Sequence, residues 1–393
     1  MAYAEGFEKG RVYFDSDSHI METLDWLESA ASASEAKLLG SIESAENAGT
    51  NAIADVIGRA EARRADPDAT RRLLEQPIIS GPKGWGAYGA STPAERSAAL
   101  DLLGFAKQLV FPTFALGQFS RSRDPDVVYA GARALTRGMG QFCSDDDRLL
   151  GVGYLPLLDV ARSLEVIELG VAEGVSAFWV SSEPPGDRSP AHVDLYPIWE
   201  KLIESRLPIM LHIGGGKLAP RVLRNNGHPA TRDWLGGGEN LRGRDYIAVS
   251  HSPENFLTAL TLDGVLQRYP DLHCGVIELG GTWVPGFLRL IDQAARSFAK
   301  TEPLIGALEM KPSDYLRRQV KWSLFPHEDA GWLIEQAGSD LFMFASDYPH
   351  PEGSKDPIGR FEKFLTDAEV GGDAKDRFYS GNFADLMGIE ARA

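Results

Sequence analysis

The sequence predicts an α/β fold, and within that class a closed barrel, on three observations. Short β-rich runs alternate with helical stretches from Val12 to about Ala345. These runs are continuously apolar, which is typical of parallel strands whose two faces are both covered. There are eight of them, and eight βα units favour a (β/α)8 TIM barrel, whereas six or fewer would favour an open, doubly wound sheet.

The expected strands can be placed in chain order by their β-branched and aromatic content. They are residues 12–14, 108–111, 149–155, 176–180, 208–211, 273–277, 320–324 and 341–345. Helical stretches lie between most of them, at 95–105, 127–139, 160–172, 196–205, 256–268 and 330–337. The brief apolar run 247–249 is interpreted as a loop or the start of a helix.

The remaining segments fit a single barrel domain that spans residues 1–393. Residues 23–103 form a long insert after the first strand, rich in Ala, Glu and Arg. A structureless loop of that length is uncommon in a compact domain, so the insert is expected to be a helical lid. Residues 366–393 are expected to form a helical C-terminal tail.

Composition limits the class of partner. The net charge is −16, which argues against nucleic acid and against an anionic membrane surface. The two cysteines, Cys143 and Cys274, lie far apart, which argues against a disulfide scaffold and a thiolate zinc site. No apolar signal segment or membrane-length run occurs, so we expect a cytoplasmic protein with a small-molecule substrate.

Polar side chains follow several of the expected strands at the point where each strand ends. Asp17 and His19 follow the first strand, and their spacing of two points them to the same side of an extended segment. His212 ends the fifth strand, Glu278 the sixth and Asp347 the eighth. Because a parallel barrel gathers its strand ends at one rim, these groups are expected to converge as ligands of one divalent metal ion.

Each of these residues also has a structural interpretation. Asp17 can simply cap a turn, a lone histidine such as His212 is more often a core residue, and Glu278 can pair with an arginine. Asp347, before Tyr-Pro, can likewise cap a loop, but it follows an almost wholly apolar run, 341–345. A buried carboxylate needs a partner, and the shared position of all these groups at strand ends favours the metal.

Three further residues are candidates for contact with substrate or for proton transfer. His251 precedes a helix, where it is a general acid–base, a further metal ligand or a histidine satisfied near the helix N-terminus. His350, in the loop after the eighth strand, and Trp283, near the rim, are expected to bind substrate together with Glu278. Trp283 favours a flat, apolar substrate, although an ordinary aromatic residue of the core would give the same sequence pattern.

The motifs "DSDSHIME", "PIMLHIGGG", "GVLQRYPDLHCGVIELGGTWVP" and "FASDYPHPEG" resemble those of the amidohydrolase-related barrel family, which includes aminocarboxymuconate-semialdehyde and hydroxybenzoate-type decarboxylases. The resemblance implies a mononuclear site with Asp17, His19, His212 and Asp347 as ligands, and His251 as the histidine that assists catalysis. It also implies a homodimer. Zn, Mn and Fe are the candidate ions, and the carboxylate of Asp17 in place of a histidine shifts the choice toward Mn or Fe.

Three functions remain open at this stage. The resemblance favours non-oxidative decarboxylation of a small aromatic or unsaturated carboxylic acid, with Asp347 or His251 handling the proton. A hydrolase that cleaves a C–N, C–O or C–C bond in a small cyclic or aromatic substrate would use the same ligands, with Asp347 accepting a proton from water. The third is a barrel with a degraded site and no catalytic role.

Overall fold

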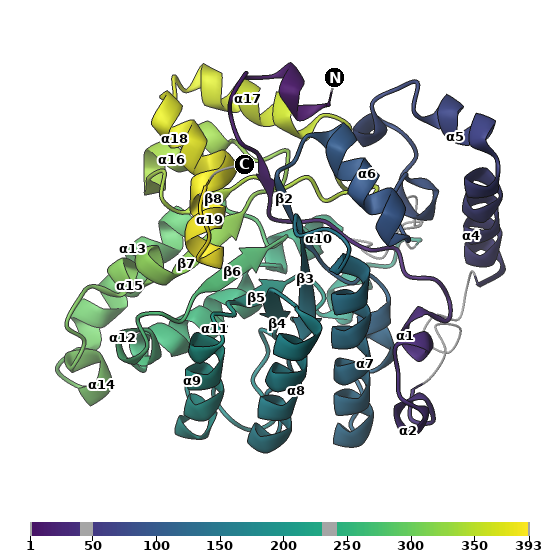
Figure 1. Cartoon of the computed structure of the whole chain (residues 1–393). Helices are drawn as coiled ribbons and strands as arrows, with labels where there is room; N and C mark the ends of the chain where they lie inside the picture. The colour runs from purple at the N-terminus through teal and green to yellow at the C-terminus, as the bar shows by residue number, and fades with distance from the viewer. Residues whose placement is uncertain (1, 40–49, 230–241, 392–393) are drawn as a thin grey trace.

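The computed structural model describes residues 2–39, 50–229 and 242–391, and it confirms the predicted barrel (Figure 1). Eight parallel strands form one sheet in the order β1 to β8, with helices between them around its outer face. The strands are β1 (Phe14–Asp15), β2 (Lys107–Val110), β3 (Leu149–Tyr154), β4 (Ala177–Trp179), β5 (Ile209–His212), β6 (Cys274–Ile277), β7 (Val320–Ser323) and β8 (Phe342–Met343).

Backbone hydrogen bonds close the sheet between its first and last strands. The Ser16 amide donates to the Phe344 carbonyl at 3.1 Å, and the Asp347 amide donates to the Asp17 carbonyl at 2.9 Å. One step further along, Ser18 and Tyr348 form an isolated parallel bridge. The closure therefore continues beyond the short strands β1 and β8, through the segments that carry Asp17 and Asp347.

The helices that cover the barrel follow the predicted alternation. They include α6 (Pro93–Leu103), α7 (Pro125–Cys143), α8 (Val160–Glu173), α9 (Tyr196–Glu204), α10 (Gly243–Ala248), α11 (His251–Leu262), α12 (Val265–Arg268) and α16 (Ala330–Ala337). Among the described residues, the α-helices that were not predicted from the sequence include α13 (Val284–Phe298), α14 (Pro303–Gly306), α15 (Pro312–Gln319) and, after β8, α17 (Pro357–Asp367). The run 247–249, interpreted as a loop or the start of a helix, instead begins with the last two residues of α10. In α13 the signal was present, because Val284, Phe287, Leu288 and Ile291 recur at helical spacing and are buried.

The insert after β1 is helical, as expected, in its described part. It contains α1 (Trp26–Ser29), α2 (Ala33–Ala36), α4 (Thr50–Ala65), α5 (Pro67–Leu73) and α6, while residues 40–49 of the predicted insert lie outside the described residues. Glu35 anchors α2 to the barrel through Arg133 and Arg137 of α7, at 2.6 and 2.9 Å. The Gly84 amide donates to the Pro349 carbonyl at 2.8 Å, so the insert also contacts the loop after β8.

The C-terminal tail is helical as well, and it packs against the last strand. It contains α18 (Gly372–Asp376), a π-helical turn (Arg377–Gly381) and α19 (Asn382–Met387). The side-chain amide of Asn382 donates to the Phe342 carbonyl at 2.7 Å, and the Phe344 amide donates to the Phe378 carbonyl at 3.0 Å. The tail thereby satisfies backbone groups of the strand that leads to Asp347.

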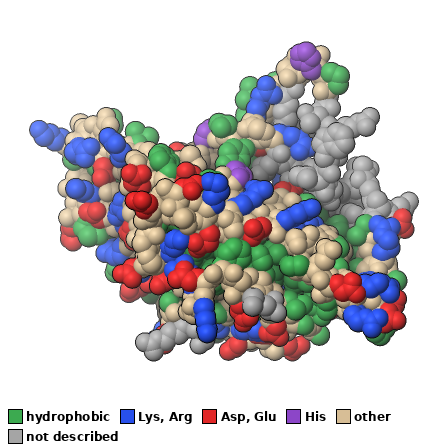
Figure 2. Space-filling view, turned by 90° about the horizontal axis from the view of Figure 1, so that it is seen from above, with side chains coloured by type: hydrophobic (Ala, Val, Ile, Leu, Met, Phe, Trp, Pro, Cys, Tyr) green, Lys and Arg blue, Asp and Glu red, His purple; other side chains and the backbone are tan. Residues whose placement is uncertain are grey.

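Among the described residues, no helix is long and apolar enough to cross a membrane. Viewed from above, acidic and basic side chains are interspersed over the described surface, without a broad basic area on that face (Figure 2).

Candidate metal centre

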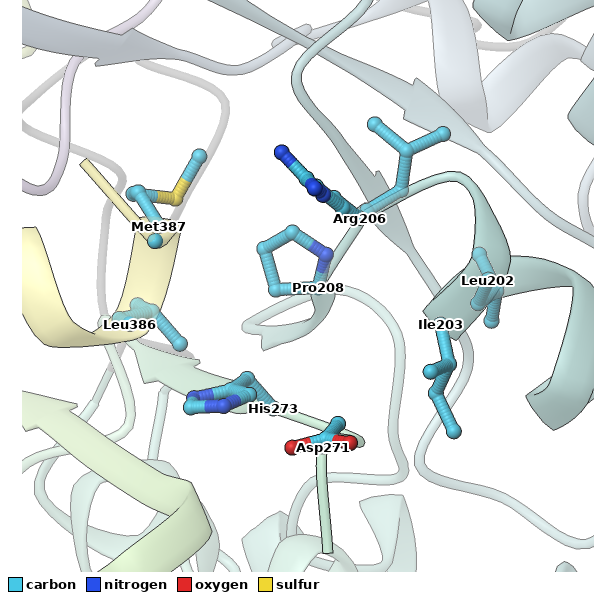
Figure 3. A pocket seen from close by; sticks show the side chains of 10 residues that line it. Leu202, Ile203, Arg206, Pro208, Asp271, His273, Leu386 and Met387 are labelled. Atoms are coloured by element: carbon cyan, nitrogen blue, oxygen red, sulfur yellow. The ribbon is translucent and has the colours of Figure 1, made fainter. Parts of the chain in front are cut away.

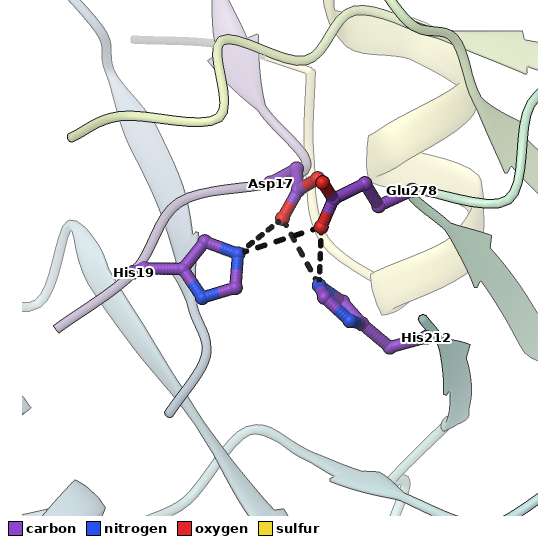
Figure 4. Close-up of side chains that lie close together, drawn as sticks. All are labelled: Asp17, His19, His212 and Glu278. Atoms are coloured by element: carbon purple, nitrogen blue, oxygen red, sulfur yellow. Dashed lines mark hydrogen bonds and ion pairs between the residues drawn. The ribbon is translucent and has the colours of Figure 1, made fainter. Parts of the chain in front are cut away.

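Four buried side chains from three strand ends meet at one point (Figure 4). The Nε2 atom of His19 lies 3.3 Å from Oδ1 of Asp17 and 3.9 Å from Oε2 of Glu278. The Nε2 atom of His212 lies 3.4 and 3.5 Å from the same two oxygens. Asp17, His19, His212 and Glu278 each expose at most 3% of their surface.

The tautomers of both histidines suit metal binding. Nδ1 of His19 lies 3.3 Å from the Pro112 carbonyl, and Nδ1 of His212 lies 2.9 Å from the Ile213 carbonyl. A carbonyl oxygen can only accept, so each Nδ1 carries the proton and each Nε2 presents a lone pair to the cluster. Nε2 of His19 is buried and has no hydrogen-bond partner among the described residues.

The residues present therefore fit a divalent cation. The lone pairs of two imidazole nitrogens and two carboxylate oxygens converge. These electron-rich atoms repel one another unless a cation lies between them. Ligand atoms about 2.1 Å from one ion and about 90–110° apart lie about 3.0–3.4 Å from each other, close to the spacings found here. Nitrogen and oxygen donors without thiolate suit Mn²⁺, Fe²⁺ or Zn²⁺.

Asp347 and His350 form a second group that shares His19 and Glu278 with the first. Oδ1 of Asp347 lies 3.7 Å from Nε2 of His19 and 3.0 Å from Nδ1 of His350. The His350 ring stacks on that of His19, with centroids 3.8 Å apart. Glu278, expected to converge on the ion and to bind substrate, belongs to both groups, and Asp347, expected as a ligand, belongs to the second group.

Two of these acidic residues have unusual backbone conformations. Glu278 and Asp347 both have a φ of +53°, in the left-handed region that non-glycine residues seldom adopt. Each is held there by neighbours: the Glu278 amide donates to the Ser323 hydroxyl at 2.9 Å, and the His350 amide donates to the Asp347 carbonyl at 2.8 Å. Strain of this kind is concentrated at functional sites, where it aims a side chain.

Beneath the cluster, Asp15 ties together strands β1, β2 and β8. Its carboxylate accepts hydrogen bonds from the Gln108 amide at 2.8 Å, the Ser346 amide at 2.8 Å and the Ser346 hydroxyl at 2.6 Å. Burial raises the pKa of Asp15 to about 7, although the hydrogen bonds from these donors lower it in part. Asp15 is therefore a buried support for the segment that carries Asp17.

Arg96 of the insert helix α6 supports the backbone of His19. It is fully buried, it donates to the His19 carbonyl, and its Nη1 donates to Gln108 Oε1 at 3.4 Å. Its guanidinium lies over the Tyr348 ring, 5.5 Å from the centroid. Burial lowers the pKa of Arg96. The insert thus positions a residue of the site, which sequence reasoning missed.

Burial and mutual contact shift the ionisation of the cluster. Burial would raise the pKa of the Asp17 carboxyl, but His19 and His212 outweigh burial and lower it. Burial, together with the neighbouring His350, lowers the pKa of His19 to about 3. Asp17 is therefore ionised and His19 neutral near pH 7, the states in which both bind a cation.

Aromatic rings enclose the histidines. The Phe111 ring centroid lies 4.5 Å from that of His212, and the Trp179 ring centroid lies 4.7 Å from that of His212. Both aromatic residues are buried. The imidazoles of the cluster consequently stand in apolar, low-dielectric surroundings, which strengthen electrostatic interactions with an ion or a charged substrate.

The other predicted site residues lie apart from this group. His251 begins α11 and is exposed, and no described contact joins it to the cluster. Trp283 caps α13 and is half-buried, and its indole N–H donates to the Leu279 carbonyl at 3.0 Å. Lys83 of the insert, which the sequence did not single out, lies over the Tyr348 ring at 5.7 Å. Burial lowers the pKa of Lys83 to about 8 although Asp347 opposes the shift.

A cavity of about 280 Å³ lies at the other end of the barrel (Figure 3). Arg206, Pro208, Asp271 and His273 line it together with the C-terminal Leu386. Pro208 and His273 immediately precede β5 and β6, whereas His212 and Glu278 end or follow those strands. This cavity is therefore separate from the metal centre.

A closed parallel barrel with an N/O ligand cluster at its strand ends defines a class of metal-site barrel proteins. A family model described as amidohydrolase matches residues 17–389, so the chain belongs to the amidohydrolase family and is an enzyme of that superfamily. A search of curated proteins gives no match.

Solved structures with the same fold include an amidohydrolase from Mycobacterium avium subsp. paratuberculosis K-10, at 18% identity and a TM-score of 0.71, covering 97% of this chain and 100% of that one. Another is 5-carboxyvanillate decarboxylase from Sphingomonas paucimobilis, at 19% identity and a TM-score of 0.61, with coverages of 97% and 100%. A third is dihydroxybenzoic acid decarboxylase from Polaromonas sp. JS666 with bound manganese and 2-nitroresorcinol, at 14% identity and a TM-score of 0.61, with coverages of 96% and 97%.

Proposed function

We propose that this chain is a metal-dependent decarboxylase of small aromatic or unsaturated carboxylic acids. The observation that carries the proposal is the pair of Nε2 lone pairs, from His19 and His212, that face the carboxylates of Asp17 and Glu278 at 3.3–3.9 Å. The decarboxylases that share the fold, one of them with bound manganese, support the choice of reaction.

In this proposal Asp17, His19, His212 and Glu278 hold the ion, and Asp347 stands at its edge. A divalent ion there would neutralise the carboxylates, bind an anionic substrate and stabilise negative charge that develops as CO₂ departs. Asp347 gives a proton to the carbon that loses CO₂, because its Oδ1 is buried, close to the cluster and paired with Nδ1 of His350 at 3.0 Å. His251 is exposed, so we assign it no proton transfer.

The surroundings favour decarboxylation over hydrolysis. The rings of Phe111 and Trp179 pack on His212 and keep the site apolar. Loss of CO₂ from a carboxylate is favoured by such surroundings, whereas hydrolysis needs an ordered water molecule as a reactant. The half-buried Trp283 would offer only ring surface to a substrate, since its N–H is already donated within the chain.

Hydrolysis of a C–N or C–O bond is the second candidate, because the matching family model is described as amidohydrolase. The two are separated by assaying Mn²⁺-loaded protein for CO₂ release from 5-carboxyvanillate and 2,6-dihydroxybenzoate, and for hydrolysis of an amide and lactone panel. Asp17→Ala and His212→Ala serve as ligand-deficient controls. CO₂ release that these variants lose supports decarboxylation, and hydrolysis without CO₂ release contradicts it.

A further inference from the structure

Glu22 is a fully buried carboxylate that the proposed reaction does not use. It accepts hydrogen bonds from the backbone amides of Thr113 at 2.8 Å, Phe114 at 3.0 Å and Ala115 at 3.3 Å. Three such bonds fix the start of the loop after β2. The side chain of Thr113 is thereby placed next to the loop after β8, which carries Asp347 and His350.

The hydroxyl of Thr113 has three neighbours. Its Oγ1 lies 2.8 Å from the Ile20 carbonyl, 3.0 Å from Nε2 of His350 and 3.9 Å from the Met21 sulfur, which is a weak acceptor at the longest distance. The carbonyl can only accept, so the single hydroxyl proton is donated to Ile20. The hydroxyl oxygen must then accept from His350, which places a proton on Nε2 of that ring.

With Nε2 facing Thr113, the other nitrogen of the ring faces Asp347, and Nδ1 lies 3.0 Å from Oδ1 of Asp347. Stacking on His19 at 3.8 Å keeps the ring from tilting away. We propose that Thr113 is a positioning residue for the reaction: its hydroxyl holds His350 as the Nε2–H form and directs Nδ1 at Asp347. This inference rests on the proposed function only where Asp347 is named as the proton donor.

The matched pair Thr113→Val and Thr113→Ser tests the role. Valine keeps the shape and removes the hydroxyl, whereas serine keeps the hydroxyl. We expect Thr113→Val to lower kcat about 10- to 100-fold with KM and bound Mn²⁺ unchanged, and Thr113→Ser to stay within about threefold of the wild type. Equal losses in the two variants would overturn the proposal, because a hydroxyl role requires serine to restore activity.

A double-mutant cycle with His350→Phe separates this role from a merely structural one. If Thr113 acts through His350, Thr113→Val has no further effect on kcat in the His350→Phe background. Additive losses would overturn the inference. Thr113→Ala provides a second replacement in case the valine variant does not fold.

The tautomer can be read without any turnover, from side-chain ¹⁵N resonances of histidine-labelled, Zn²⁺-loaded protein. We expect the His350 ring in the wild type to carry its proton on Nε2, and we expect Thr113→Val to change the His350 resonances. A wild-type ring without a proton on Nε2 would overturn the inference whatever the enzyme catalyses. Absence of decarboxylation by the wild type would instead count against the proposed function.

Discussion

Replacing Glu278 with Gln should change stability in opposite directions with and without metal. The ligand atoms of Glu278 and Asp347 lie within 4.8 Å of each other in a buried site. Two ionised carboxylates at that separation repel by about 3 kcal/mol at an effective dielectric constant of about 20. Proton uptake by one of the carboxylates relieves part of this repulsion. We therefore expect the metal-free Glu278→Gln variant to be about 1–3 kcal/mol more stable than the wild type.

With Mn²⁺ the order should reverse. The amide lacks the charge of the carboxylate, and we expect a loss of Mn²⁺ affinity of at least about 200-fold, which removes at least about 3 kcal/mol of metal-linked stabilisation and so offsets the metal-free gain. For 393 residues the unfolding entropy makes 1 kcal/mol equivalent to about 1 °C in Tm. Calorimetry in chelator and across an Mn²⁺ titration should therefore show crossing Tm values.

The matched control is Glu335→Gln, because Glu335 is exposed on α16. The Tm of Glu335→Gln should match that of the wild type both in chelator and with Mn²⁺. Our assignment of Glu278 as a ligand of the ion would be wrong if Glu278→Gln had the Tm of the wild type in chelator and also bound Mn²⁺ with unchanged affinity.

Three further predictions concern the supports of the barrel and the limits of the site. Arginine contacts lower the pKa of Glu35 to about 2 in spite of burial, so its stabilising effect is complete above its ordinary pKa of 4.5 and is lost as the pH falls toward 2. Glu35→Gln should lower the free energy of unfolding by about 1–3 kcal/mol at pH 7, with the difference shrinking below pH 4.5 in urea titrations; a constant difference would contradict this. A Cβ at Gly353 would lie 2.6 Å from the Ser346 carbonyl oxygen and 2.8 Å from that of Asp347, so Gly353→Ala should cost about 1–3 kcal/mol and reduce kcat, and wild-type values for both would refute it. His251→Ala should retain wild-type Mn²⁺ content and stability within about 0.5 kcal/mol, and loss of the ion on dialysis would show that His251 reaches the site.

The architecture and the convergence of polar groups were predictable because both follow from local patterns. Continuous apolar runs identify buried parallel strands, and the residue that follows such a strand lies at the rim. On this basis Asp17, His19, His212, Glu278 and Asp347 were all expected near one point, and the structure brings them together. Their division into two overlapping groups depends on the exact turn after each strand, which a sequence pattern does not specify.

The residues that support the cluster could not be predicted in this way. Asp15, Arg96 and Thr113 act through contacts between segments far apart in the chain, such as Asp15 with Ser346 and Arg96 with His19. Those contacts follow from the register of neighbouring strands and the path of the insert. Residues 15–17, which follow the expected first strand, are acidic or polar and are compatible with several turn geometries. The sequence therefore did not indicate that Asp15 is buried.

We infer that one divalent ion is held by Asp17, His19, His212 and Glu278 at the strand ends of the barrel. Anomalous diffraction from Mn²⁺-soaked crystals would locate this ion. We expect a single strong peak within about 2.0–2.4 Å of ligand atoms from these four residues. A peak elsewhere, or a featureless map at this position with saturating Mn²⁺, would contradict it.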